Sequence, residues 1–322
     1  MMGQSVENAP SQMKAEHVVA IATAVLAVLT LLAGGTVNPT GSSLACPEAF
    51  VICHGSLFPK MVGGVLFEHG HRLIAMAVGF SQIALTVLLW RRRPSLRPLA
   101  ALTLFMVCFQ GLLGALTVKY QLPWAVSLAH LGHAMAYLAL LIGLSWKTRT
   151  MSHQSQTFDV VTIKKWVFIA SVAVIAQILL GGLVRHHEAA LASLELPFHE
   201  GTLWPQNPPL PLALHLIHRM MGVLVGLVVV FCSVKIFALS PRKSLLRRLS
   251  ALGPLLVFLQ IFLGVSVILS FRATSIAVGH FAGAVALWIL CCVLWMMASN
   301  SKPADVKPLS IKQNPLHGRA AA

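Results

Sequence analysis

Charged residues are scarce in this sequence. Only 10% of the 322 residues are Asp, Glu, Lys or Arg, and 57% are apolar, whereas about 25% of the residues of an ordinary soluble domain are charged. The shortage excludes a soluble globular domain and indicates a protein of the lipid bilayer.

Two targeting signals are also missing. The first apolar run lacks a small-residue cleavage site and is expected to stay as a helix, and no Arg-rich transit sequence is present, which favours a bacterial plasma membrane over an organelle.

Apolar runs long enough to cross about 30 Å of hydrocarbon as a helix are abundant instead. Eight of them are predicted to span the membrane: 17–35, 66–90, 98–118, 122–145, 165–184, 212–238, 249–270 and 274–297. The predicted fold is therefore an all-α integral membrane protein with eight transmembrane helices.

The basic residues are distributed unevenly between the loops. Those in or beside alternate loops are Arg91, Arg92, Arg93, Arg97, Lys147, Arg149, Lys164, Lys165, Lys235, Arg242, Lys243, Arg247 and Arg248. The other loops hold Lys60, Lys119, Arg185 and Arg272. By the positive-inside rule, this pattern places both termini in the cytoplasm. The same arrangement accounts for the net charge of +15, so no nucleic acid is expected as a partner.

The two halves of the chain share a sequence pattern. Four pairs of segments match at offsets of 147 or 150 residues: AGGTV at 33–37 with LGGLV at 180–184, HRLIAMAVG from His71 with HRMMGVLVG from His218, QGLLGALTV from Gln110 with QIFLGVSVI from Gln260, and AHLGHA around His130 with GHFAGA around His280. Each half holds four spans, an even number, so the repeat is parallel. We predict two four-helix bundles related by an approximate two-fold axis along the membrane normal, at 1–150 and 151–298, and a polar cytoplasmic tail at 299–322.

This repeat selects four of the 14 histidines. Two pairs occupy equivalent positions, His71 with His218 and His130 with His280. Each of the four lies six to nine residues into a span that enters from the outer side, which corresponds to a depth of about 9 to 13 Å. One pair is therefore expected in each bundle, at similar depth in the outer half of the membrane.

Histidines inside a membrane are costly and usually functional. Two neutral imidazoles on opposite helices of a four-helix bundle supply the axial ligands of a heme iron. We therefore predict that each pair binds a porphyrin, with interhelical hydrogen bonding, a proton relay or another metal site as alternatives. Arg72 and Arg219 follow the first histidine of each half, and they are predicted to contact heme propionates or to reach the outer headgroups.

A Gln-x-x-Leu-Gly pattern occurs at Gln110, Gln177 and Gln260. Small residues let helix backbones approach closely, so a structural role is predicted, in which the glutamines can bond across helices.

Glu68 lies three residues before His71 on the same helix face, where the second half has His215. A carboxyl group beside a porphyrin can accept protons or stabilise positive charge. We predict a catalytic role for Glu68, with a solvated interfacial acid as the alternative.

Cys46 and Cys53 lie in the first outer loop, on the side of the membrane where disulfides persist. A disulfide is predicted, with a reactive redox pair or two free thiols as alternatives. The second half has no equivalent cysteine pair, so the first half is expected to be the specialised one.

These residues together resemble the heme A synthase family, in its cysteine-containing bacterial form, across nearly the whole chain. The motifs are the Cys-x6-Cys loop, the Glu-x-x-His-Arg sequence from Glu68 to Arg72, and the positions of His130, His218 and His280. The resemblance implies an oxidoreductase that converts the C8 methyl group of heme O into a formyl group, with water as the oxygen source. It also implies a heme O synthase and a membrane electron acceptor as partners.

The resemblance also implies different roles for the two halves. It implies that His71 and His130 hold the substrate heme O with Glu68 assisting, that His218 and His280 bind a heme b cofactor, and that Cys46 and Cys53 are the family's disulfide pair. His69, His133 and His215 are local alternatives to these ligands, but none has a histidine at the equivalent position of the other half. A diheme b-type, quinol-linked electron carrier is the alternative function.

Overall fold

The computed structural model describes residues 14–149, 157–299 and 302–303. Eight helical segments of this part of the chain are long and apolar enough to cross a membrane, which confirms the predicted all-helical, multi-pass fold. They are α1 (Ala15–Val37), α2 (Gly64–Arg92), α3 (Arg97–Lys119), α4 (Trp124–Lys147), α5 (Val160–His186), α6 (Leu210–Leu239), α7 together with α8 (Leu245–Ser250 and Leu252–Leu269), and α9 (Thr274–Ser299). Most of the predicted tail lies outside the described residues.

Short elements complete the described chain. Two 3-10 turns, η1 (Pro94–Leu96) and η2 (Ala189–Leu191), lie in loops, and the two-residue strands β1 (Thr157–Phe158) and β2 (Lys302–Pro303) pair in parallel. The strands are a small addition to the predicted all-α fold.

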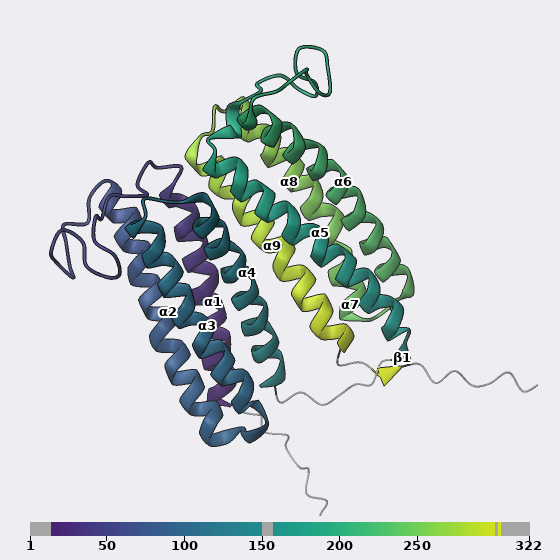
Figure 1. Ribbon diagram of the computed structural model, residues 1–322. Helices are drawn as coiled ribbons and strands as arrows, with labels where there is room; N and C mark the ends of the chain where they lie inside the picture. Colours follow the sequence, from purple (N-terminus) through teal and green to yellow (C-terminus); the bar gives the residue numbers. More distant parts are fainter. Residues whose placement is uncertain (1–13, 150–156, 300–301, 304–322) are drawn as a thin grey trace, which may run out of the picture.

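The helices form two groups that lie side by side, α1 to α4 and α5 to α9 (Figure 1). Within the first group, the contacting neighbours are α1–α2, α2–α3, α3–α4 and α4–α1. Within the second, they are α5–α6, α6–α8, α8–α9 and α9–α5. The order of contacts is the same in both groups, and α2 with α4, and α6 with α9, lie diagonally across their groups. A two-fold axis between the groups stays a prediction.

Two turns on the predicted outer side, one in each group, share an unusual backbone. Gln121 and Leu122, between α3 and α4, have φ of 54° and 62°, and Phe271 and Arg272, between α8 and α9, have φ of 50° and 64°. Side chains rarely adopt this left-handed conformation. The two pairs are offset by the same 150 residues as the sequence repeat, so these turns agree with a duplicated fold.

Polar side chains inside the first group bond to one another rather than to solvent. Gln82 is fully buried, donates to Thr103 at 2.9 Å, and accepts from the hydroxyl group of Tyr137 at 2.9 Å. Near the cytoplasmic end predicted above, the buried Glu16 of α1 accepts from Arg93 at 2.9 Å. These bonds connect α2, α3 and α4, and α1 with the end of α2, in a setting where unpaired polar groups are costly.

Candidate heme-binding site

His71 lies on α2 and contacts α1. Its Nδ1 is 3.1 Å from the carbonyl oxygen of Thr30. Because a carbonyl can only accept, Nδ1 carries the proton and Nε2 keeps its lone pair. This neutral tautomer is the form in which an imidazole binds a metal ion through Nε2.

A glycine lies against each of the four repeated imidazoles. The pairs, with the distance from a Cβ placed on the glycine to Cε1 of the histidine, are Gly34 with His71 (2.9 Å), Gly114 with His130 (3.2 Å), Gly181 with His218 (3.2 Å) and Gly264 with His280 (3.2 Å). We call these four residues the cradle glycines. A side chain at any of them would press on the imidazole, so the backbone leaves space for a histidine ring at four equivalent places.

Glutamines on neighbouring helices hold two of these histidines. The amide nitrogen of Gln110 donates to the main-chain oxygen of His130 at 3.1 Å and lies 3.2 Å from its Nδ1. Gln177 does the same for His218, at 2.9 Å and 3.0 Å. Each glutamine lies four residues before a cradle glycine on one helix face. The Gln-x-x-Leu-Gly pattern therefore contacts histidine, as well as allowing helices to pack.

The second-half imidazoles face each other across their bundle. The ring centroids of His218 and His280 are 6.4 Å apart, and the ring planes differ by 80°. A metal ion with a nitrogen ligand at about 2 Å on either side separates two imidazole rings by about this distance. Among the described residues, Nδ1 of His280 and Oε1 of Gln260 are buried without a hydrogen-bond partner. The pair therefore fits the axial ligands of a heme.

The first-half pair also comes from diagonal helices, His71 from α2 and His130 from α4. Each of the two has its cradle glycine. The donor set is the same as in the second half, so it fits a second porphyrin.

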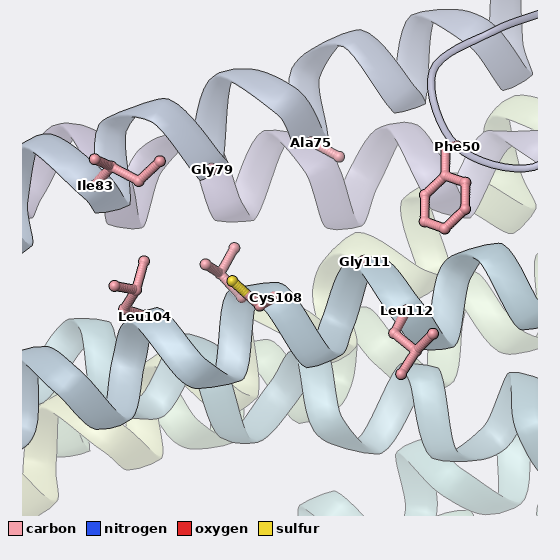
Figure 2. Close-up of a pocket in the computed structure, with 9 residues that line it drawn as sticks. Phe50, Ala75, Gly79, Ile83, Leu104, Cys108, Gly111 and Leu112 are labelled. Carbon is pink, nitrogen blue, oxygen red and sulfur yellow. The ribbon is translucent and has the colours of Figure 1, made fainter.

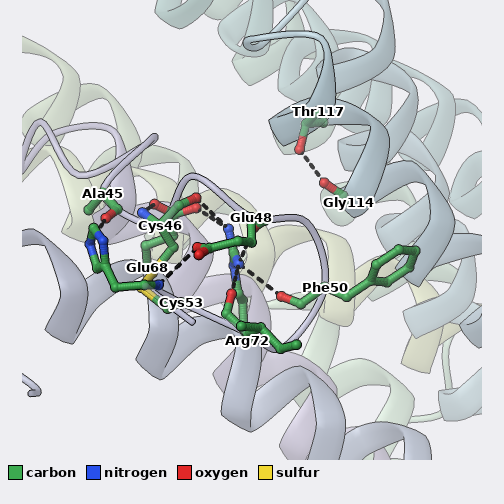
Figure 3. Close-up of polar contacts among 11 residues, drawn as sticks. Ala45, Cys46, Glu48, Phe50, Cys53, Glu68, Arg72, Gly114 and Thr117 are labelled. Carbon is green, nitrogen blue, oxygen red and sulfur yellow. Dashed lines mark hydrogen bonds and ion pairs between the residues drawn. A yellow bond between two sulfur atoms is a disulfide. The ribbon is translucent and has the colours of Figure 1, made fainter. Parts of the chain in front are cut away.

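Glu68 connects α2 to the first outer loop, residues 38–63 (Figure 3). Its Oε1 accepts from Arg72 at 2.6 Å, and its Oε2 accepts from the main-chain nitrogen of Cys46 at 2.8 Å. Only 4% of Glu68 is exposed. The alternative of a solvated interfacial acid is therefore wrong, and the carboxylate is a buried group one turn from His71.

The guanidinium group of Arg72 donates hydrogen bonds to the main chain of the same loop. Its four main-chain acceptors are Cys46 (3.1 Å), Glu48 (2.6 Å), Phe50 (2.9 Å) and Ile52 (3.0 Å). Arg219 of the second half makes fewer such contacts, to the oxygen of Pro197 at 2.7 Å and to Ser193 Oγ at 3.3 Å. Both arginines bind outer loops, and their contact with propionates stays a prediction.

The disulfide predicted in this loop is present. Cys46 and Cys53 are bonded and fully buried. Nearby, the carboxylate of Glu48 accepts from the main-chain nitrogens of His54 and Gly55, both at 2.9 Å. Desolvation raises the pKa of Glu48, but these N–H groups outweigh it and hold the pKa below its ordinary value of 4.5.

The three local alternatives to the ligand histidines all have other partners. Nε2 of His69 lies 2.9 Å from the carbonyl oxygen of Leu57, and Nδ1 of His133 lies 2.7 Å from Oε1 of Gln110. The main-chain nitrogen of Ser193 donates to Nδ1 of His215 at 3.2 Å. His69 lies beside the disulfide. The contact at Nδ1 leaves Nε2 of His133 able to bind a metal ion, so the sequence repeat is what selects the quartet, which remains the predicted ligand set.

The two halves meet beside the first-half site. Arg185, near the outer end of α5, lies 3.5 Å from the carbonyl oxygen of Gly34, the cradle glycine of His71. Trp288 of α9 donates to the carbonyl of Met135 in α4 at 2.9 Å. Sequence reasoning missed Arg185 and the cradle glycines as neighbours of the histidines, although the repeated Gly-Gly pair was a visible signal.

Comparison with known proteins identifies the family of this chain. The chain is 28% identical to the heme A synthase of Shouchella clausii (strain KSM-K16) over 290 residues, which cover 88% of this chain and 96% of the relative. It is 27% identical to the heme A synthase of Alkalihalophilus pseudofirmus over 271 residues (81% and 89%) and 26% identical to that of Bacillus cereus (strain AH187) over 306 residues (91% and 96%). Residues 61–292 match a family described as cytochrome oxidase assembly protein. This chain belongs to that family of cytochrome oxidase assembly proteins.

Proposed function

We propose that this protein is a heme A synthase, which oxidises the C8 methyl group of heme O to a formyl group with water as the source of oxygen. Family membership and the names of the relatives support the activity. The observation that carries the proposal is an asymmetry. Both halves have a histidine pair with cradle glycines, but only the first adds Glu68 and a disulfide-bonded loop.

The two halves would have different roles in this reaction. His71 and His130 would hold the substrate heme O, and His218 and His280 would hold a heme b cofactor. Conversion of a methyl group and water into a formyl group releases four electrons and four protons. Bound heme b supplies a redox centre through which electrons can leave.

Glu68 would act on the reacting carbon from its position one turn from His71. Both carboxylate oxygens already accept hydrogen bonds. Stabilisation of positive charge that develops on the substrate therefore suits this group better than proton transfer.

The chain would work in the plasma membrane of a bacterium, with both termini in the cytoplasm and the heme pairs toward the outer face. A heme O synthase would supply the substrate, and a membrane electron acceptor would remove the electrons.

Mass spectrometry of extracted hemes tests the proposal. Purified protein in lipid nanodiscs receives heme O and an electron acceptor in water enriched in oxygen-18, and we expect labelled heme A. Preformed heme A in the same water is the control for exchange of the formyl oxygen. Failure to form heme A, with two hemes that are reversibly reduced, would instead identify a diheme electron carrier.

A further inference from the structure

The space between α2 and α3 is a groove lined by apolar and small residues. It has a volume of about 290 Å³. Ala75, Gly79 and Ile83 of α2 form one side, and Cys108 and Gly111 of α3 lie on the other (Figure 2). We call it the α2–α3 groove.

The second half is filled at the equivalent place. Gly226, the repeat equivalent of Gly79, packs closely on α8, because a Cβ placed on it would lie 3.1 Å from Val257 and 3.8 Å from Ile261. A Cβ placed on Gly79 would meet nothing within 4 Å. The equivalent of Ile261 is Gly111, so the first half lacks the side chain that closes the groove in the second.

A second position of the groove wall also differs. Cys108 lines the groove, whereas its repeat equivalent is Phe258, which is 71% exposed and so does not fill the second half. The replacement of Ile261 by Gly111 is therefore the change that opens the groove, and Cys108 is a small residue of its wall.

The groove begins at the predicted substrate site. Ala75 is one turn from His71 on α2, and Gly111 follows Gln110, which binds His130. Phe50 of the first outer loop lies at the outer end (Figure 2), and its carbonyl oxygen accepts from Arg72.

From this end the groove runs along the helices. Ile83 is eight residues beyond Ala75, which corresponds to about 12 Å along the helix axis. The groove therefore starts about one helical turn from His71 and extends along α2 away from the histidine pair.

We propose that the α2–α3 groove holds the isoprenoid tail of the substrate heme. This inference rests on the proposed function. Heme O carries a long farnesyl-derived side chain that heme b lacks, so only the substrate half requires room for it. The volume lies at the lower end of the range of about 300–1,000 Å³ for ligand pockets, which suits a tail and is small for a porphyrin with its substituents.

Shape, rather than hydrophobicity, would give this groove its selectivity. The hydrocarbon of the bilayer is as apolar as the groove, so the tail gains little by leaving lipid. A groove filled with side chains would instead obstruct the tail of a heme bound at His71 and His130. A heme without a tail would be unaffected.

The test gives the first half the residues of the second, in the double variant Gly111→Ile with Cys108→Phe. Heme O and tail-less protoheme are each titrated into purified protein that already holds heme b in its second half, and binding is followed by the Soret absorption. We expect the affinity for heme O to fall by about tenfold or more and that for protoheme to stay within about twofold. Ala22→Ile, at an exposed position of α1, is the control for added bulk facing lipid.

Two other binding results would contradict the groove assignment. Equal weakening of both hemes would show that the groove only packs helices. No weakening of either would show that the tail lies elsewhere and that lipid occupies the groove. If the double variant discriminates as expected but the unaltered protein never forms heme A, the groove stands and the proposed reaction fails.

Discussion

At the scale of single residues, absent side chains shape the candidate heme sites as much as the predicted ligands do. Each cradle glycine leaves the space that its histidine ring occupies. Overpacking of such a site by new methyl groups costs about 1–3 kcal/mol. The site is therefore sensitive to substitutions that add no charge and remove no ligand.

Gly181→Val tests this dependence in the second half. We expect the amount of heme b per protein to fall by at least about fivefold, because the new side chain displaces His218. The amount of heme in the first half should not change. Extracted heme per protein is the measurement. Gly279→Val is the matched control, since a Cβ at Gly279 meets only Leu263, at 3.9 Å. Equal loss in both variants would contradict the role of the cradle.

Glu68→Gln separates the charge of Glu68 from its hydrogen bond to the loop. The amide oxygen can still accept from Cys46, but the negative charge is lost, so we expect conversion of heme O to fall by about 100-fold with heme content within about twofold. Turnover and extracted pigments are measured together. Glu16→Gln, which alters another buried carboxylate paired with arginine, is the control and is expected to retain activity. Undiminished conversion by Glu68→Ala would show that Glu68 is not catalytic.

The four repeated histidines can be selected from the sequence because the repeat aligns them, but their main-chain partners cannot. Thr30 contacts His71 through its main-chain carbonyl. Every residue type has this group, so the sequence does not indicate which one makes the contact. The five acceptors of Arg72 are likewise mostly carbonyls of a loop whose path depends on the disulfide and on Glu68. Main-chain partners of this kind become visible only in the folded chain.

At the scale of elements, the first outer loop is an ordered cover rather than a simple connection. Arg72, Glu68 and the disulfide all attach residues 46–53 to the outer end of α2. The second outer loop has fewer bonds from Arg219. The two loops should therefore differ in local stability.

Arg72→Lys is expected to loosen the first outer loop, because lysine has three donors and lacks the planar fork of arginine. Hydrogen exchange of residues 38–63 should accelerate by about tenfold. Arg219→Lys in the second loop is the matched comparison and should have a smaller effect. Similar acceleration in both loops would contradict the special role of Arg72.

The pH dependence of this loop follows from Glu48. Its folded pKa lies below the ordinary value of 4.5, so its contribution to loop stability is fully present above pH 4.5 and is lost as the pH falls through the folded pKa. Hydrogen exchange near His54 and Gly55, corrected for intrinsic rates, should therefore show extra opening only in that acidic range. Glu48→Gln should abolish this step, and a step that persists would assign it to another group.

The element bounds show where hydropathy is a good guide and where it is not. The second and sixth spans were predicted within two residues of α2 and α6. α5 begins at Val160, earlier than predicted, because Asp159 caps it by accepting from Thr162 while two lysines reduce the local hydropathy. The seventh predicted span, 249–270, corresponds to α8, and only its first two residues belong to the short preceding helix α7, which hydropathy did not predict.

At the scale of the whole molecule, the two halves hold similar histidine pairs but differ in the residues around them. The helix contacts and outer turns of the halves correspond. The buried carboxylate, the disulfide loop and the open α2–α3 groove belong to the first half. This distribution supports a substrate site in the first half and a permanent cofactor in the second.

Heme analysis of variants that each lack one ligand tests this assignment most directly. Hemes extracted from His130→Ala and His280→Ala proteins are identified by mass and counted per protein. We predict that His130→Ala keeps heme b but loses hemes O and A, and that His280→Ala loses heme b and leaves heme O unconverted. Loss of the same heme from both variants, or an unaltered protein without any heme, would contradict the division of function between the halves.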